Sequence, residues 1–170
     1  MLMQMVRARG GRPIGINSRE EKARPLREHG FEALVGNGDQ TALVRELVPD
    51  GVDVVFDPNG ADTWQLTLAS TRRRGHVVLF GAASGRIAPA APYVLLERGS
   101  LTLSYVSIFD YIADAAERQT RVDDVFSMLA ARTIVPPAVH VFPLAQASEA
   151  HAFLESRTSV GKIVLAASSG

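Results

Sequence analysis

Short apolar segments of strand length alternate along the whole chain with longer segments of helical periodicity. The clearest strand candidates are 52–57 and 76–81, which are rich in valine and are followed by turn residues. Further strands are expected over 12–17, 33–35, 101–107 and 162–166, and helices over 1–9, 18–29, 41–48, 62–74, 113–131 and 144–157. This alternation is typical of βαβ units and predicts an α/β fold with a parallel sheet. Because no linker or repeat interrupts residues 1–170, a single domain is expected.

Three local patterns predict how the helices begin and end. Ser18 and Glu21 have the spacing of a capping box, so Ser18 is expected to cap the helix over 18–29. Asp62 is expected to cap the helix that follows the 52–57 strand. The basic run 72–74 is expected at the end of that helix, where the helix dipole favours positive charge.

Composition excludes several classes of function. The chain has 18 basic and 18 acidic residues, so no field of one sign is available to attract nucleic acid or an anionic membrane. It has no cysteine, which excludes disulfides, thiolate zinc ligands and thiol catalysis. The four histidines have no metal-ligand spacing, so no metal site is expected. No Ser/His/Asp arrangement or carboxylate pair stands out, so acyl transfer and glycoside hydrolysis have no support. A cytoplasmic protein that binds a small molecule is expected.

Four segments together resemble one known family. They are IGINSREEK at 14–22, GVDVVFDPNGADT at 51–63, RGHVVLFGAASG at 74–85, and LESR at 154–157 leading to GKIVL at 161–165. In this order and spacing they resemble the nucleotide-binding half of the medium-chain dehydrogenase/reductase superfamily, in its zinc-independent quinone oxidoreductase (zeta-crystallin-like) branch. The resemblance implies a Rossmann-like, doubly wound, mostly parallel sheet that binds NADPH. It also implies hydride transfer to a quinone or an enoyl or enone substrate, and a homodimer.

The resemblance also implies parts that this sequence lacks. Family members carry a catalytic domain before this region, then a central strand and a glycine-rich turn that binds the pyrophosphate. Without that first strand the sheet is expected to be truncated, with two interior strand edges unpaired. The terminal strand, within 158–170, would pair with the absent domain. We therefore expect a fragment that is inactive alone, and no catalytic residue is assigned.

The resemblance places the 2′-phosphate of NADPH at Ser18 and Lys22, with Arg19 adding charge. An NAD enzyme would more often carry an acidic residue at position 17, where this chain has asparagine. The alternative is a capping box beside an exposed helix lysine. Asn37 stands where the family often has a tyrosine against the adenosine, and its Asn-Gly pair is equally explained as a turn.

The nicotinamide end of the cofactor is expected beside turns that follow strands. Asn59 and Gly60 follow one strand, and Phe80, Gly81 and Ala82 follow the next, at the edge where ligands bind in open α/β sheets. The alternative is that these residues only form short turns.

Tyr105 matches a family segment near the ring, although it departs from the family residues and can equally be a packing residue. The strand 101–107 is expected to pair across the homodimer. The competing functions are a non-catalytic dimerisation or nucleotide-sensing module, and an inactive gene fragment.

Overall fold

The computed structural model describes residues 1–36, 40–89, 91–156 and 158–167. Its helices are α1 (Leu2–Ala8), α2 (Glu20–Glu28), α3 (Gln40–Leu47), α4 (Trp64–Ser70), α5 (Tyr93–Glu97), α6 (Ile108–Tyr111), α7 (Ala115–Ala130) and α8 (Ala147–Glu155), with 3-10 turns η1 (Ala61–Thr63) and η2 (Leu144–Gln146). Its strands are β1 (Ile14–Asn17), β2 (Glu32–Val35), β3 (Val52–Asp57), β4 (Thr71–Leu79), β5 (Thr102–Tyr105), β6 (Val139–Pro143) and β7 (Lys162–Ala166). None of the described helices is long and apolar enough to cross a membrane.

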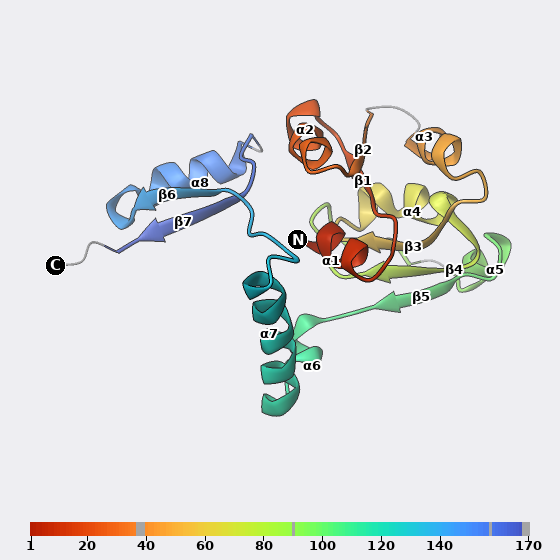
Figure 1. The fold of residues 1–170 in the computed structure, drawn as a ribbon. Coiled ribbons are helices and arrows are strands. Elements are labelled where there is room, and N and C mark those ends of the chain that lie inside the picture. Colours follow the sequence, from red (N-terminus) through yellow and green to blue (C-terminus); the bar gives the residue numbers. More distant parts are fainter. Residues whose placement is uncertain (37–39, 90, 157, 168–170) are drawn as a thin grey trace. The chain divides into compact units, whose positions relative to one another are not determined.

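The described strands form three separate sheets (Figure 1). β1 pairs with β2, β4 lies between β3 and β5, and β6 pairs with β7. The β3–β4–β5 and β6–β7 ladders are parallel, which confirms the predicted α/β class. Among the described strands, only β4 has two partners, and the other six each have one.

The chain divides into two compact units, one of Leu34–Asp123 and one of Met1–Ala33 with Asp124–Gly170. The core of the Leu34–Asp123 unit lies between α4 and the sheet. Trp64 and Leu68 are four residues apart and face the sheet together, because that spacing is about one helical turn. Val77 and Leu79 meet them from β4, since residues two apart share a strand face. Leu101 completes this cluster.

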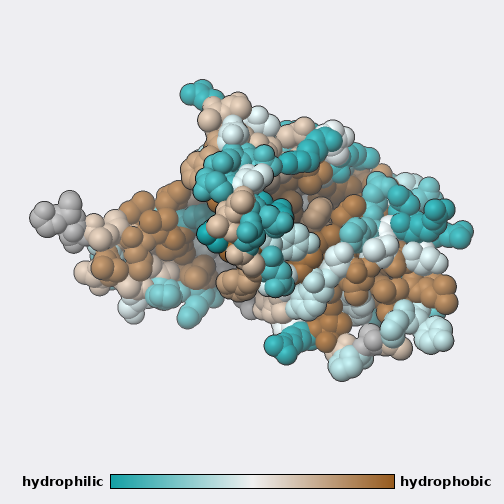
Figure 2. All heavy atoms as spheres, turned by 90° about the horizontal axis from the view of Figure 1, so that it is seen from below, coloured by the Kyte–Doolittle hydropathy of each residue, from teal (hydrophilic) through white to brown (hydrophobic). Residues whose placement is uncertain are grey.

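The other unit is held by smaller contacts. α2 packs against β1 and buries Ala23 completely. The guanidinium of Arg7 lies 3.5 Å from the centre of the Phe31 ring and donates to the carbonyl oxygen of Gly30. α8 contacts β6 and β7, and exposed valines, among them Val141 and Val164, remain on these strands. Figure 2 shows this hydrophobic surface over the β6–β7 segment.

Two predicted helix caps are wrong. α2 begins at Glu20 with the extended residue Arg19 as its N-cap, and no side chain caps it, so Ser18 lies one residue too early. Arg27 holds this end of α2 in place, because it forms an ion pair with Glu20 and donates to the carbonyl oxygen of Ala33 at 2.7 Å.

Asp62 lies within η1 and caps nothing. The turn between β3 and α4 is instead organised by Asp57, which was not singled out from the sequence.

The basic run 72–74 is also misplaced by the sequence analysis, because it belongs to β4 and not to a helix end. α4 stops at Ser70, where the hydroxyl of Thr71 donates to the carbonyl oxygen of Thr67 at 2.7 Å. The β3–β4 register then shifts between Val52 and Val54, and Arg74 takes a positive φ. The sequence analysis also missed α5, α6 and β6. None of the described residues of α7 is buried.

Candidate functional site

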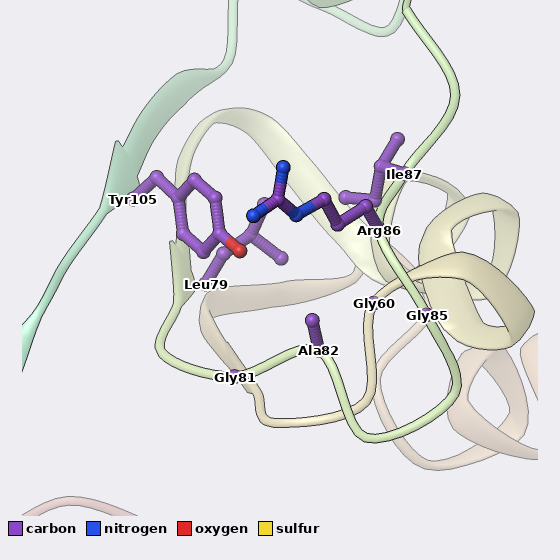
Figure 3. Close-up of a pocket in the computed structure, with 8 residues that line it drawn as sticks. All are labelled: Gly60, Leu79, Gly81, Ala82, Gly85, Arg86, Ile87 and Tyr105. Atoms are coloured by element: carbon purple, nitrogen blue, oxygen red, sulfur yellow. The ribbon is translucent and has the colours of Figure 1, made fainter.

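A pocket of about 300 Å³ lies at the carboxyl ends of β3, β4 and β5 (Figure 3). Gly60 comes from the turn after β3, and Tyr105 is the last residue of β5. Leu79 and the loop after β4 supply the rest, and the lining residues of that loop are Gly81, Ala82, Gly85, Arg86 and Ile87. In open parallel sheets this edge is where ligands bind, because the loops of neighbouring strands converge there.

Asp57 organises the turn that carries Gly60. Its side chain is buried, at 3% exposed, and both of its oxygens accept hydrogen bonds. Oδ1 accepts from the backbone amides of Asn59 at 2.8 Å and Gly60 at 3.2 Å. The hydroxyls of Thr63 and Thr67 each donate to Oδ2 at 2.8 Å. The carboxylate therefore anchors the end of β3 to the start of α4.

The turns after β3 and β4 are joined by hydrogen bonds. The amide of Ala83 donates to the carbonyl oxygen of Pro58 at 3.2 Å, and that of Ser84 donates to the carbonyl oxygen of Asn59 at 2.9 Å. In return, the amide of Ala61 donates to the carbonyl oxygen of Gly85 at 3.1 Å. The pocket floor is therefore built from two mutually supporting turns.

Packing explains why glycine occupies positions 60 and 81. Gly60 has a φ of +90°, and a Cβ there would lie 2.6 Å from the carbonyl oxygen of Gly85. A Cβ on Gly81 would collide with the carbonyl oxygen of Pro58. Close backbone packing thus requires both glycines even without a ligand, which supports the turn interpretation. Both also line the pocket, so the cofactor interpretation stays open.

The pocket brings together four of the residues predicted from the sequence: Gly60, Gly81, Ala82 and Tyr105. Asn59 and Phe80 are their chain neighbours but do not line it. Tyr105 is 67% exposed, which argues against a packing role in this chain. Asn37 lies outside the described residues.

Ser18, Arg19 and Lys22 lie in the Met1–Ala33 part of the other unit, directly after β1. None of these three side chains forms a hydrogen bond or ion pair with another described residue. The neighbouring Glu20 is engaged by Arg27, so its charge does not neutralise them.

Just before this group, the amide nitrogen Nδ2 of Asn17 is buried without a partner. Together, the unsatisfied amide of Asn17 and the cationic side chains of Arg19 and Lys22 suit the binding of an oxygen-rich, negatively charged group.

Four residues that line the pocket were not predicted from the sequence, and Arg86 is the charged one; the others are Leu79, Gly85 and Ile87. Arg86 is a single cation in a run of small and apolar residues, GAASGRIAPA, directly after the strongest strand. A charge in such a position at a strand's carboxyl end was the signal that could have identified it. Asp57 could not be found in this way, because its partners are set by the turn geometry.

Comparison with known proteins gives consistent matches. The family described as zinc-binding dehydrogenase matches residues 29–165. A quinone oxidoreductase of Pseudomonas aeruginosa is 32% identical over 165 residues, which are 95% of this chain and 51% of that protein.

Two matching solved structures are complexes with NADPH. One is a mycobacterial protein with a TM-score of 0.87 and 36% identity, over 96% of this chain and 52% of that one. The other is the quinone oxidoreductase of Escherichia coli, with a TM-score of 0.86 and 30% identity, over 95% of this chain and 51% of that one. The chain thus spans about half the length of the curated relatives that it matches.

The residues present do not fit a zinc ion, despite the description of the matching family. Zinc sites take three or four ligands from cysteine, histidine and carboxylates. The chain has no cysteine, and the described residues contain no group of three or more histidine, aspartate or glutamate side chains that could hold a metal.

Proposed function

Because the chain belongs to the zinc-binding dehydrogenase family, we propose that it is the NADPH-binding part of a zinc-independent, cytoplasmic quinone-reductase-like oxidoreductase. The complete enzyme would transfer a hydride to a quinone or to an enoyl or enone substrate. The observation that carries this proposal is the pocket at the carboxyl ends of β3, β4 and β5, in a fold that matches structures solved with NADPH. When bound, NADPH supplies the hydride, and the protein holds and orients the cofactor.

The 2′-phosphate of NADPH is assigned to Ser18, Arg19 and Lys22. Two of these side chains are cationic, and none has a polar partner among the described residues. The amides at the start of α2 have no side-chain cap, and a helix N-terminus favours an anion. Asn17 leaves a buried donor at the same point. A neutral residue at position 17 also avoids the repulsion that a carboxylate would exert on the phosphate.

The nicotinamide end is assigned to the pocket, with Gly60, Gly81, Ala82 and Tyr105 on its walls and Asn59 and Phe80 beside them. The pocket is lined mainly by glycine and by the apolar Leu79 and Ile87, which suits a flat uncharged ring. The phenol of Tyr105 is placed to donate a hydrogen bond at the rim.

A non-catalytic dimerisation or nucleotide-sensing module is the second candidate, and one observation favours it. β5 is an edge strand among the described residues, and it exposes Leu103 and Tyr105. An open edge with apolar side chains favours pairing with a second strand. A homodimer through 101–107 would fit either function.

NADPH titration tests the proposal and separates the candidates. Trp64 is the only tryptophan of the chain and lies in the core next to η1, so its emission can report binding at the β3 turn. Saturable NADPH binding with turnover of a small quinone supports the oxidoreductase, and binding without turnover supports the nucleotide-sensing module. If neither NADPH nor NADH changes the emission, and equilibrium dialysis also finds no binding, the cofactor proposal fails.

A further inference from the structure

Arg86 is a charged side chain on the wall of the pocket. It is exposed, and it makes no side-chain hydrogen bond or ion pair with another described residue. Figure 3 shows its guanidinium pointing from the loop after β4 toward Tyr105 on the opposite wall. A guanidinium in this position presents a planar set of donors to a ligand that enters the pocket.

The rest of the pocket limits the size and polarity of that ligand. Leu79, Ile87 and the ring of Tyr105 make its walls apolar. Its volume of about 300 Å³ is at the lower end of the range for small-molecule sites, roughly 300–1,000 Å³. A small molecule with an apolar body and one anionic group fits these walls, next to the nicotinamide ring that the proposed function assigns to the same pocket.

The single guanidinium of Arg86 and the small size of the pocket favour a carboxylate as that group. Within the loop after β4, the amides of Ala83, Ser84 and Gly85 donate to carbonyl oxygens of the chain, so these three amides are not free to bind a ligand. A carboxylate needs few donors, because its two oxygens match the fork of one guanidinium. The hydroxyl of Tyr105, which has no hydrogen bond to the described residues, offers one more donor.

We propose that Arg86 binds the carboxylate of a small unsaturated acid, and that such an acid is the substrate of this site. The redox part rests on the proposed function: the β carbon of the acid receives the hydride of NADPH, and the α carbon receives a proton from solvent. The carboxylate contact itself does not depend on NADPH. Arg86 is therefore assigned as a specificity-determining residue.

The test measures binding of trans-2-butenoate to the full chain by NMR titration, with uncharged trans-2-butenamide as the matched ligand. The variants are Arg86→Gln and, as a control of equal charge change, Arg98→Gln, whose side chain bonds Gln65 and does not line the pocket. NADPH binding is measured separately for each protein. Because Arg86 is exposed and unpartnered, its replacement is expected to leave the thermal melt unchanged.

The expected result is that Arg86→Gln weakens butenoate binding about tenfold, or about 1.4 kcal/mol, while Arg98→Gln leaves it unchanged. The amide should bind weakly to all three proteins. The inference is overturned if butenoate does not bind, if the amide binds equally well, or if Arg86→Gln weakens NADPH and not butenoate, which would assign Arg86 to a cofactor phosphate. Arg86-dependent butenoate binding without any NADPH binding would support the carboxylate site and refute the cofactor proposal alone.

Discussion

Asp57 gives the sharpest test of how the pocket is built. Replacing it with alanine removes the acceptor of the Asn59 and Gly60 amides in a site where the side chain is 3% exposed. The Gly60 amide and the Thr67 hydroxyl are then buried without a partner at a cost of about 1–3 kcal/mol each, so Asp57→Ala should lower the free energy of unfolding by about 2–6 kcal/mol. That is a large part of the roughly 5–15 kcal/mol typical of a domain.

Asp57→Asn should cost less, about 1–2 kcal/mol. Its carbonyl oxygen can still accept from both amides, and its amide group can donate to the hydroxyls of Thr63 and Thr67. What is lost is the extra strength of hydrogen bonds to a charged acceptor. The three substitutions compared are therefore Asp57→Ala, Asp57→Asn and the control Asp53→Ala.

Asp53 makes a matched control because it lies on the same strand but 79% exposed, in a 2.6 Å ion pair with Arg72. Exposed ion pairs contribute about 0–1 kcal/mol, so Asp53→Ala should change stability little. Urea unfolding followed by Trp64 emission measures all three variants in the unit that contains both aspartates. If Asp57→Ala unfolds at the same urea concentration as Asp53→Ala, the turn does not depend on the carboxylate and our account of the pocket floor is wrong.

Three further predictions concern the cofactor, a glycine and the sheet edge. Lys22→Met should weaken NADPH binding about tenfold and leave NADH binding unchanged. Lys162→Met, at the only other lysine of the chain, should change the binding of neither nucleotide. Equal weakening of NADPH and NADH binding by Lys22→Met would contradict the phosphate assignment. Gly81→Ala should lower the free energy of unfolding by about 1–3 kcal/mol without any ligand, because the new methyl group collides with the Pro58 carbonyl oxygen. Urea unfolding measures this change. Unchanged stability together with weaker NADPH binding would instead mean that the glycine is needed for ligand binding. The amide of Val106 donates to the carbonyl oxygen of Leu79 on β4, and successive amides of a strand point to opposite sides, so the amide of Leu103 faces the open edge of β5. Leu103→Pro should therefore abolish a dimer that pairs through β5, as measured by light scattering after size exclusion. An unchanged dimer would place the interface elsewhere.

Residue patterns were enough to predict the α/β class, the order of the main elements and the family. The 52–57 and 162–166 strands were predicted with the bounds that the structure has, because their valine and isoleucine residues favour strands. The family resemblance was confirmed by the matching family and relatives.

The ends of the strands and the lining of the pocket follow from contacts between residues that are distant in the sequence. The basic run 72–74 joins β4 instead of closing a helix, because α4 stops at Ser70 and Arg72 pairs with Asp53 from the neighbouring strand. The role of Asp57 depends on a turn that brings two backbone amides and two threonine hydroxyls within hydrogen-bond distance of its carboxylate. Arg86 and Tyr105 are 19 positions apart in the sequence and face each other only because β4 and β5 are parallel neighbours. Such contacts depend on the path of the chain in space, which local residue patterns do not encode.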